Sequence, residues 1–348
     1  MNRSKQAALL LTSLACLLPV VVIASIGVGA VPIPAGDIIS VLLDRIGVTN
    51  SDTPTQVALI IESIRLPRTL LGLLVGGALA VAGASMQGLF RNPLADPSIV
   101  GVASGSALGA GIAIVLGGVL FAGASSLVQS YSISILSFIG GAISTWLVYK
   151  IGTTNNGTSV ATMLLGGVAI NALAGAGMGM LNYVADDTML RNLTFWQMGS
   201  IGGATWELVT ICVTLLLPVI LVLCRHGQVL NALLLGESEA RHLGIDIQRV
   251  KLMLILLTAL AVGVSVSVSG VIGFVGLVVP HLIRLMVGPD HKILLPASAM
   301  LGGILLLVAD MVARVIVAPA ELPIGIVTAL MGAPFFLSLL WQQRNRIA

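Results

Sequence analysis

The stretch IRLPRTLLGLLVGGALAVAGASM, residues 64–86, decides the fold class of this chain. It begins with Arg65 and Arg68 on either side of Pro67 and then continues without a charged residue to Met86. A helix needs about 20 mainly apolar residues to cross the hydrocarbon core of a bilayer. The stretch therefore predicts a transmembrane helix that carries two permanent cations at its beginning.

Composition extends this prediction to the whole chain. Of the 348 residues, 57% are hydrophobic and 9% are charged, whereas an average soluble domain is about 25% charged. We expect one all-α polytopic membrane domain over residues 1–348 with about ten transmembrane helices. The spans are placed near residues 7–30, 66–86, 98–118, 131–149, 160–183, 207–224, 251–269, 272–286, 293–312 and 322–341. The eighth is short and glycine-rich and ends in PHLIR, which predicts a broken or tilted helix.

The basic residues predict the orientation of the chain. With the N-terminus in the cytoplasm, 12 of the 17 basic residues lie inside and five lie outside, namely Arg45, Arg65, Arg68, Arg191 and Arg314. Lys and Arg are in excess in cytoplasmic segments, so we expect both termini in the cytoplasm and an uncleaved first helix. The basic pI of 9.0 follows from this topology and implies no nucleic-acid partner.

Several motifs of enzymes are absent from the sequence. It contains no G-x-x-x-x-G-K-[ST] nucleotide-binding loop, no H-E-x-x-H and no G-x-S-x-G. Cys16, Cys212 and Cys224 lie in predicted spans without the spacing of a metal site or a disulfide framework. We therefore expect no enzymatic activity, no metal site and no permanently bound cofactor. If transport is driven by ATP, a separate chain must bind the nucleotide.

Small residues at four-residue spacing predict close contacts between helices. They occur at Gly72 and Gly76, at Gly101, Gly105 and Gly109, and at Gly175 and Gly179. Such spacing lets two helix backbones approach closely. The interfaces are either static bundle packing or surfaces that rearrange during transport.

Charged residues inside the predicted spans are few. Asp310 and Glu207 lie near the outer ends of their spans, and no span centre carries a charge. Proton- and sodium-coupled carriers usually keep ionisable groups near the middle of the membrane, so this pattern disfavours ion coupling. Asp310 precedes Arg314 by four residues, a spacing that predicts an ion pair on one helix face.

The longest predicted cytoplasmic segment is RHGQVLNALLLGESEARHLGIDIQRVK, residues 225–251. Gly236 and Gly244 are expected to divide it into two short helices, with Glu237 and Glu239 between them. Its apolar residues are Leu230, Leu233, Leu234, Ala240 and Leu243. Exposed leucines on short helices indicate a partner surface, and a lid that folds back on the bundle is the alternative.

Six stretches of the chain resemble one family in order and spacing. They are RLPR, GASMQGLFRNPLADPSIVGVASGSALGA, LTFWQMGSIGGATW, LLLGESEARHLGI, GFVGLVVPHLIRLMVGPDH and ADMVARVIVAPAELPIGIVTALMGAPFF. The chain is similar in these stretches to the FecCD/BtuC-like permeases of ABC importers for iron chelates, haem and cobalamin. The resemblance implies a ten-helix inner-membrane subunit that pairs with a copy of itself. It also implies two ATPase subunits on the cytoplasmic side and a periplasmic substrate-binding protein.

The resemblance also implies roles for individual residues. Arg65, Arg68 and Arg314 match outer arginines that form salt bridges with glutamates of the binding protein, and interfacial anchors that reach towards lipid headgroups are the alternative. Asn92 and Leu94 match a cytoplasmic gate, for which a simple Asx turn is the alternative. A second gate maps onto Ser159 to Thr162. The coupling helices that contact the ATPase match Gly236, Glu237, Glu239, Ala240, Leu243 and Gly244.

The C-terminal part of the chain is most similar to haem permeases, so haem is the expected substrate. A ferric siderophore and cobalamin are the alternatives within the family. An ion-coupled secondary carrier or a structural membrane scaffold would be alternatives from other classes.

Overall fold

A computed structural model describes residues 3–48, 53–154 and 157–347 of the chain. The helices are α1 (Arg3–Gly27), α2 (Ala35–Arg45), α3 (Thr55–Ile60), α4 (Leu66–Leu89), α5 (Val102–Leu120), α6 (Ser126–Gly152), α7 (Val160–Val184), α8 (Asp187–Gln197), α9 (Trp206–Arg225), α10 (Gly227–Leu235), α11 (Glu237–His242), α12 (Ile247–Ser269), α13 (Val275–Val287), α14 (His291–Val315) and α15 (Ile324–Ile347). A π-helical turn, η1 (Ile61–Arg65), joins α3 to α4 without a break. A 3-10 turn, η2 (Pro97–Val100), precedes α5, and a short hairpin of β1 (Thr153–Thr154) and β2 (Gly157–Thr158) precedes α7.

The predicted spans correspond to helices of this structure. Within the described residues, 8 helices are long and apolar enough to cross a membrane, and α13 and the first part of α15 are shorter apolar helices. Each of the ten predicted spans overlaps one of these helices. The short helices α2 and α8 lie outside the predicted spans and were not anticipated from the sequence.

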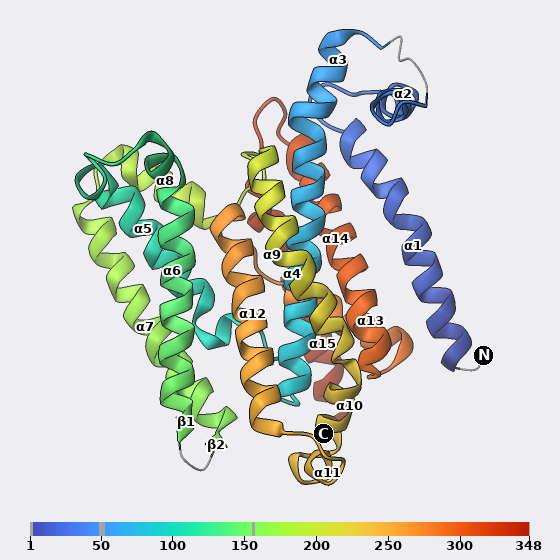
Figure 1. The fold of residues 1–348 in the computed structure, drawn as a ribbon, viewed down its shortest axis with the longest axis vertical. Coiled ribbons are helices and arrows are strands. Elements are labelled where there is room, and N and C mark those ends of the chain that lie inside the picture. The colour runs from blue at the N-terminus through green and yellow to red at the C-terminus, as the bar shows by residue number, and fades with distance from the viewer. Residues whose placement is uncertain (1–2, 49–52, 155–156, 348) are drawn as a thin grey trace.

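The two ends of the bundle carry different elements (Figure 1). Helices α2 and α3 lie at one end, which we call the α2 end. The beginning of α1, the end of α15, the hairpin and α10–α11 lie at the other, the α11 end. The beginning of α1 and the end of α15 thus lie on the side of the predicted coupling segment. That this side faces the cytoplasm stays a prediction.

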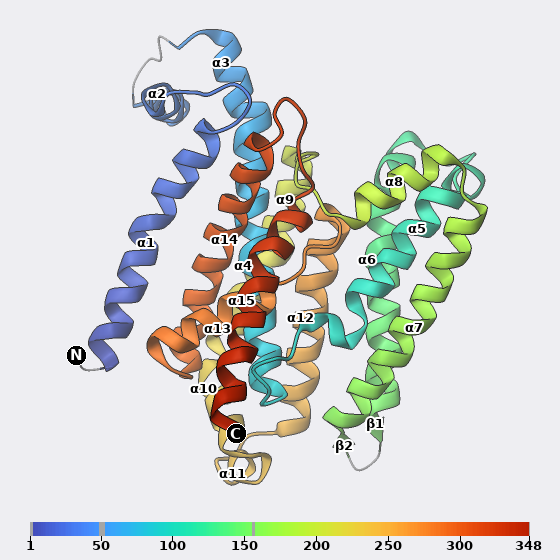
Figure 2. The ribbon, with the colours of Figure 1, turned by 180° about the vertical axis from the view of Figure 1, so that it is seen from behind.

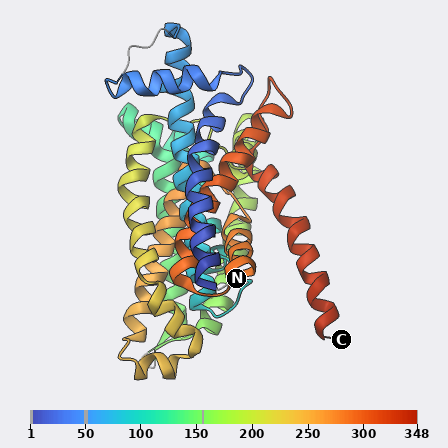
Figure 3. The ribbon, with the colours of Figure 1, turned by 90° about the vertical axis from the view of Figure 1, so that its right-hand side faces the viewer.

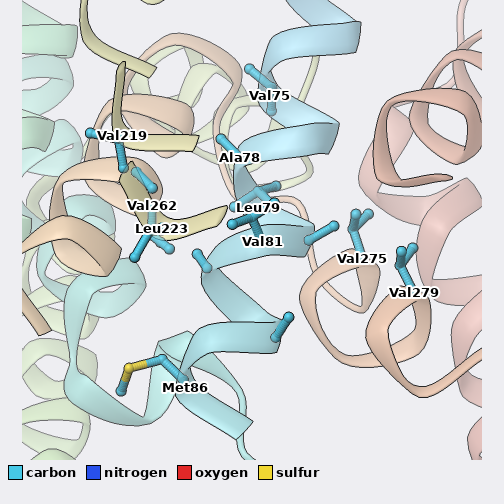
Figure 4. Packing of buried hydrophobic residues seen from close by; sticks show 14 of the residues in the cluster. Val75, Ala78, Leu79, Val81, Met86, Val219, Leu223, Val262, Val275 and Val279 are labelled. Atoms are coloured by element: carbon cyan, nitrogen blue, oxygen red, sulfur yellow. The ribbon is translucent and has the colours of Figure 1, made fainter. Parts of the chain in front are cut away.

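Helix α4 forms the centre of the bundle. It packs against α14, α9, α12 and α13, and most of its residues are buried. Figure 4 shows Leu79 and Val81 of α4 lying between side chains of α9 and α12 on one side and of α13 on the other. Its arginine-flanked apolar run, which decided the fold class, therefore contacts other helices on nearly all sides.

Glycines allow α4 to approach its neighbours closely. A Cβ at Gly76 would overlap the carbonyl of Gly302 in α14, and a Cβ at Gly83 would overlap the carbonyl of Gly276 in α13. The predicted small-residue contact at Gly76 is therefore present within the chain. Such close approach provides the van der Waals packing on which helix association in a membrane depends.

Two further groups of helices flank this centre. Helices α5, α6 and α7 pack together on one side, as Figure 1 shows, and α6 also contacts α12. Helix α1 lies on the other side against α14, and α15 packs against α13 and α14 (Figures 2 and 3).

The eighth predicted span is broken, as its sequence indicates. Helix α12 ends at Ser269, and α13 begins only at Val275 after a non-helical stretch. Phe274, at the beginning of α13, has a φ of 67°, a left-handed conformation that is rare for a bulky residue. A cavity of about 310 Å³ adjoins this break and reaches Asp96 and Pro97 of the segment between α4 and α5.

Candidate functional site

The three arginines that the sequence singles out lie close together at the α2 end. Arg65 belongs to η1, Arg68 to the first turn of α4 and Arg314 to the last turns of α14. All three are buried, with exposed fractions of 8%, 7% and 4%. With Asp310 and Glu321 they form a group that we call the arginine cluster.

Both carboxylates of the arginine cluster bind the guanidinium group of Arg68, and Asp310 also binds that of Arg314. Asp310, which is buried, accepts from Nη2 of Arg68 at 2.8 Å and from Nε of Arg314 at 2.9 Å. Glu321, in the loop between α14 and α15, accepts from Nη1 of Arg68 at 2.9 Å. The predicted Asp310–Arg314 pair is thereby confirmed, and Arg68 holds two carboxylates through the planar fork that suits this geometry.

Arg65 and Arg314 also bind the backbone at the end of α1 and just after it. Arg314 donates to the carbonyls of Ser25 and Val28, both at 2.9 Å, and Arg65 donates to the carbonyls of Val28 and Val31. The last carbonyls of a helix lack partners within the helix, and cations near them are stabilised by the helix dipole. The arginine cluster therefore joins α1, α4 and α14.

The arginine cluster carries more positive than negative charge. Three guanidinium groups face two carboxylates, and the C-terminal end of α1 supplies part of the missing negative charge. A Cβ at Gly29 would overlap the guanidinium of Arg65, so the chain after α1 must carry glycine there for Arg65 to reach its carbonyls.

Glu321 is the most exposed member of the arginine cluster, since 46% of its side chain remains accessible. Its partial burial favours the neutral acid, but the hydrogen bond and charge of Arg68, with Arg314 and Arg65, lower the pKa of Glu321 below its usual value. A carboxylate with a lowered pKa contributes stability at neutral pH and loses it as the pH falls through that pKa. The Glu321–Arg68 pair is thus formed at pH 7 and is lost only in acid.

The arginines lie at one end of the bundle, as predicted, but their surroundings were not anticipated from the sequence. The alternative that they reach towards lipid headgroups is wrong, because their side chains point into the chain. Their docking role stays a prediction. Glu321 and Ser25 were not singled out, and for Glu321 the only signal was a carboxylate near an apolar helix.

The predicted gate residues lie in the turn after α4, at the α11 end. The backbone N–H of Leu94 donates to Oδ1 of Asn92 at 2.9 Å, which is an Asx turn. Asn92 is exposed and Leu94 is half-buried. The turn is therefore present, and a gate role for these two residues stays a prediction. In the second segment, Ser159 accepts from the backbone N–H of Thr162 and caps α7.

The predicted coupling segment folds into two short helices, but its details differ from expectation. Glu237 and Glu239 belong to the first turn of α11 rather than to a linker between the helices. Gly236 and Gly244 have φ values of 123° and 81°, which explains why glycine stands at these two turns. Glu239 is exposed and Glu237 is half-buried.

The apolar residues of the coupling segment divide into two groups. Leu230, Leu233 and Ala240 are buried against the bundle, so the expectation that they are exposed is wrong. Leu235 and Leu243 are exposed at 70% and 66%. Only the second group, with Leu234, is available for a partner.

Comparison with known proteins gives consistent matches over most of the chain. The model of the FecCD transport family matches residues 17–342. The hemin transport system permease protein HmuU of Yersinia pestis is 46% identical over 284 residues, which is 82% of this chain and 84% of the relative. The cobalamin import system permease protein BtuC of Halobacterium salinarum is 43% identical over 293 residues, 84% of this chain and 76% of the relative. A solved structure of a metal-chelate type ABC transporter in an inward-facing conformation has a TM-score of 0.82 at 33% identity, and the match covers 95% of this chain and 98% of that one.

Proposed function

Because this chain belongs to the FecCD transport family and is the permease subunit of an ABC importer, we propose that it carries haem across the bacterial inner membrane. The observation that carries the proposal is the similarity to the hemin permease of Yersinia pestis. Cobalamin is the second candidate, because the similarity to the cobalamin permeases is nearly as high. A ferric siderophore remains the third.

The energy for transport would come from partner subunits. The chain lacks a nucleotide-binding loop, and the exposed Leu235 and Leu243 lie beside the charged residues of α11. A surface with exposed leucines on short helices suits a protein partner. We propose that two ATPase subunits bind on the cytoplasmic side, one at this surface of each permease chain.

A second copy of the chain is proposed to pack against α7. Gly175 and Gly179 of this helix face open space, since a Cβ added at either position would meet none of the described atoms within 4 Å. Leu165, Leu173 and Met180 are exposed on the same helix. Small residues four apart on an uncovered membrane helix suit close approach of another helix.

Replacing Gly175 and Gly179 by isoleucine is expected to weaken this dimer about fivefold, or about 1 kcal/mol. The larger side chains would hold the two α7 backbones apart without a clash inside either chain. Gly118→Ile in α5 is the control, since that glycine also faces open space. The monomer–dimer equilibrium can be measured by cross-linking at increasing dilution in detergent. An unchanged equilibrium would place the dimer contact elsewhere.

The arginine cluster is proposed to receive the binding protein at the α2 end. Three guanidinium groups lie there, and only Glu321 among their two carboxylate partners is partly exposed. A glutamate of the binding protein could therefore take the place of Glu321 on Arg68. The three arginines are buried. A carboxylate of the binding protein would therefore reach Arg68 by displacing Glu321.

Reconstitution tests the substrate proposal. The chain would be placed in liposomes with its ATPase subunit, and its binding protein would be loaded with haem, cobalamin or a ferric siderophore. We expect haem to accumulate only with ATP and with the binding protein, and we expect no uptake after the ATPase subunit is left out.

The other outcomes distinguish the alternatives. Uptake of cobalamin or the siderophore alone would retain the permease and overturn the choice of haem. Uptake without any ATPase subunit would indicate a secondary carrier and would contradict the whole proposal.

A further inference from the structure

Lys251, in the second turn of α12, is buried although it is a lysine. Only 3% of the residue is exposed, and lysine is almost never fully buried unless it is paired. The beginning of α12 lies at the α11 end, next to α11 (Figure 1).

The ammonium of Lys251 binds two separate elements. Nζ lies 2.8 Å from Oε1 of Glu237, in the first turn of α11. It also donates to the carbonyl of Thr158, in β2, at 3.0 Å. An ammonium on a flexible stem has three donors, so one side chain can hold both elements at the same time.

A neighbouring residue strengthens the second of these contacts. Gln248, one turn earlier on α12, accepts from the backbone N–H of Thr158 at 3.1 Å. A Cβ at Gly157 would overlap the amide of the same glutamine. Strand β2 is thus held on α12, with both backbone groups of Thr158 bound.

Thr158 leads directly into α7. The next residue, Ser159, caps that helix, and residues 159–162 form the segment that matches a second gate by resemblance. Helix α7 otherwise packs mainly against α5 and α6. Lys251 therefore links the coupling segment to the beginning of a helix whose Gly175 and Gly179 face open space among the described residues.

We propose that Lys251 is a positioning residue that transmits movement of the coupling segment to the beginning of α7. Displacement of α11 by the ATPase would pull Lys251 through Glu237 and shift Thr158 together with the beginning of α7. The inference rests on the proposed function, because it requires an ATPase that moves α11.

The test compares Lys251→Met with Arg249→Met in the complete transporter. Methionine keeps the length and packing of the stem but removes both polar contacts of Lys251. Arg249 lies two residues earlier on α12, has a side chain that is 88% exposed and pairs with Asp246 on the surface. Haem uptake and ATP hydrolysis are measured in the same liposomes, and Lys251→Arg tests rescue by a cation.

We expect Lys251→Met to keep ATP hydrolysis within about twofold of the native rate and to lose at least about tenfold in uptake per ATP hydrolysed. Arg249→Met should change neither quantity, and Lys251→Arg should recover most of the coupling. Leu243→Asp shows how loss of the ATPase subunits differs from loss of coupling, because it is expected to detach these subunits altogether.

A second measurement does not depend on the substrate. In a chain whose three native cysteines are replaced by alanine, Ser159→Cys is labelled with a maleimide, with and without ATP. ATP should change the labelling rate in the otherwise native chain but not in Lys251→Met. If haem is not transported by the native complex, the substrate proposal fails while this measurement still tests Lys251.

Two results would overturn the inference. The first is full uptake per ATP and an unaltered ATP-dependent labelling change in Lys251→Met. The second is loss of the ATPase subunits from Lys251→Met, as in Leu243→Asp, since Lys251 would then shape the partner surface instead. If Lys251→Met does not accumulate in the membrane, the same two measurements are made on Glu237→Gln, because Glu237 is partly exposed and glutamine weakens its contact with Lys251 while keeping the shape of the side chain.

Discussion

Replacing Asp310 with alanine is expected to destabilise the folded chain by about 3–5 kcal/mol, the usual cost of removing one partner from a buried ion pair. Asp310 is 1% exposed and accepts from both Arg68 and Arg314. Without it, Glu321 would be the one carboxylate left to the two buried guanidinium groups among the described residues. Thermal unfolding of the purified chain in detergent would measure the loss.

Asp187→Ala provides the control for this experiment. Asp187 is exposed in the first turn of α8, and substitutions at such positions usually change stability by less than about 0.5 kcal/mol. If Asp310→Ala unfolds at the same temperature as Asp187→Ala, the arginine cluster does not stabilise the fold. Its arginines would then be free to serve docking alone.

Replacing Glu321 with glutamine is expected to strengthen docking of the binding protein about tenfold, or about 1.4 kcal/mol. Glutamine keeps the shape of Glu321 but removes the charge that competes for Arg68. The net charge of the arginine cluster would rise by one, and an incoming carboxylate would meet less competition. Binding of the purified binding protein to the chain in detergent measures the effect.

The pH dependence separates this effect from a change in fold. Because the pKa of Glu321 lies below its usual value of 4.5, the native carboxylate is ionised throughout the neutral range. The difference in affinity between the native chain and Glu321→Gln should therefore be constant near pH 7 and should disappear only as the pH falls through the lowered pKa of Glu321.

Glu207→Gln is the matched control, since Glu207 lies at the same end of the bundle and is exposed. It should leave docking unchanged. Equal affinity of the native chain and Glu321→Gln would contradict the exchange of carboxylates on Arg68, and weaker binding by Glu321→Gln would indicate that Glu321 itself contacts the partner.

Local patterns in the sequence predicted the parts of this structure that depend on local physics. Each transmembrane helix corresponds to one long apolar run, and the Asp310–Arg314 pair follows from its spacing on one helix. The turns at Gly236 and Gly244 follow from the conformational freedom of glycine. The break before α13 follows from its short glycine-rich span.

Contacts between distant parts of the chain could not be predicted in the same way. Arg65 and Arg314 bind backbone carbonyls near the end of α1, and backbone groups are alike at every position of a sequence. Lys251 meets a carbonyl 93 residues away. Leu230 and Leu233 could not be distinguished from the exposed Leu235, because only the packing of α10 on the bundle decides which face is covered.

The hydrogen bonds between the arginine cluster and the end of α1 affect how the chain can be inserted during biosynthesis. Helix α1 leaves the ribosome before α14, yet the carbonyls at and just after its end bind Arg314 of α14. During translation these carbonyls must remain hydrated at the membrane surface or find temporary partners until α14 has been inserted. A nascent chain that stops before α14 would lack these contacts, so membrane quality control could recognise an incomplete product by the unbound end of α1.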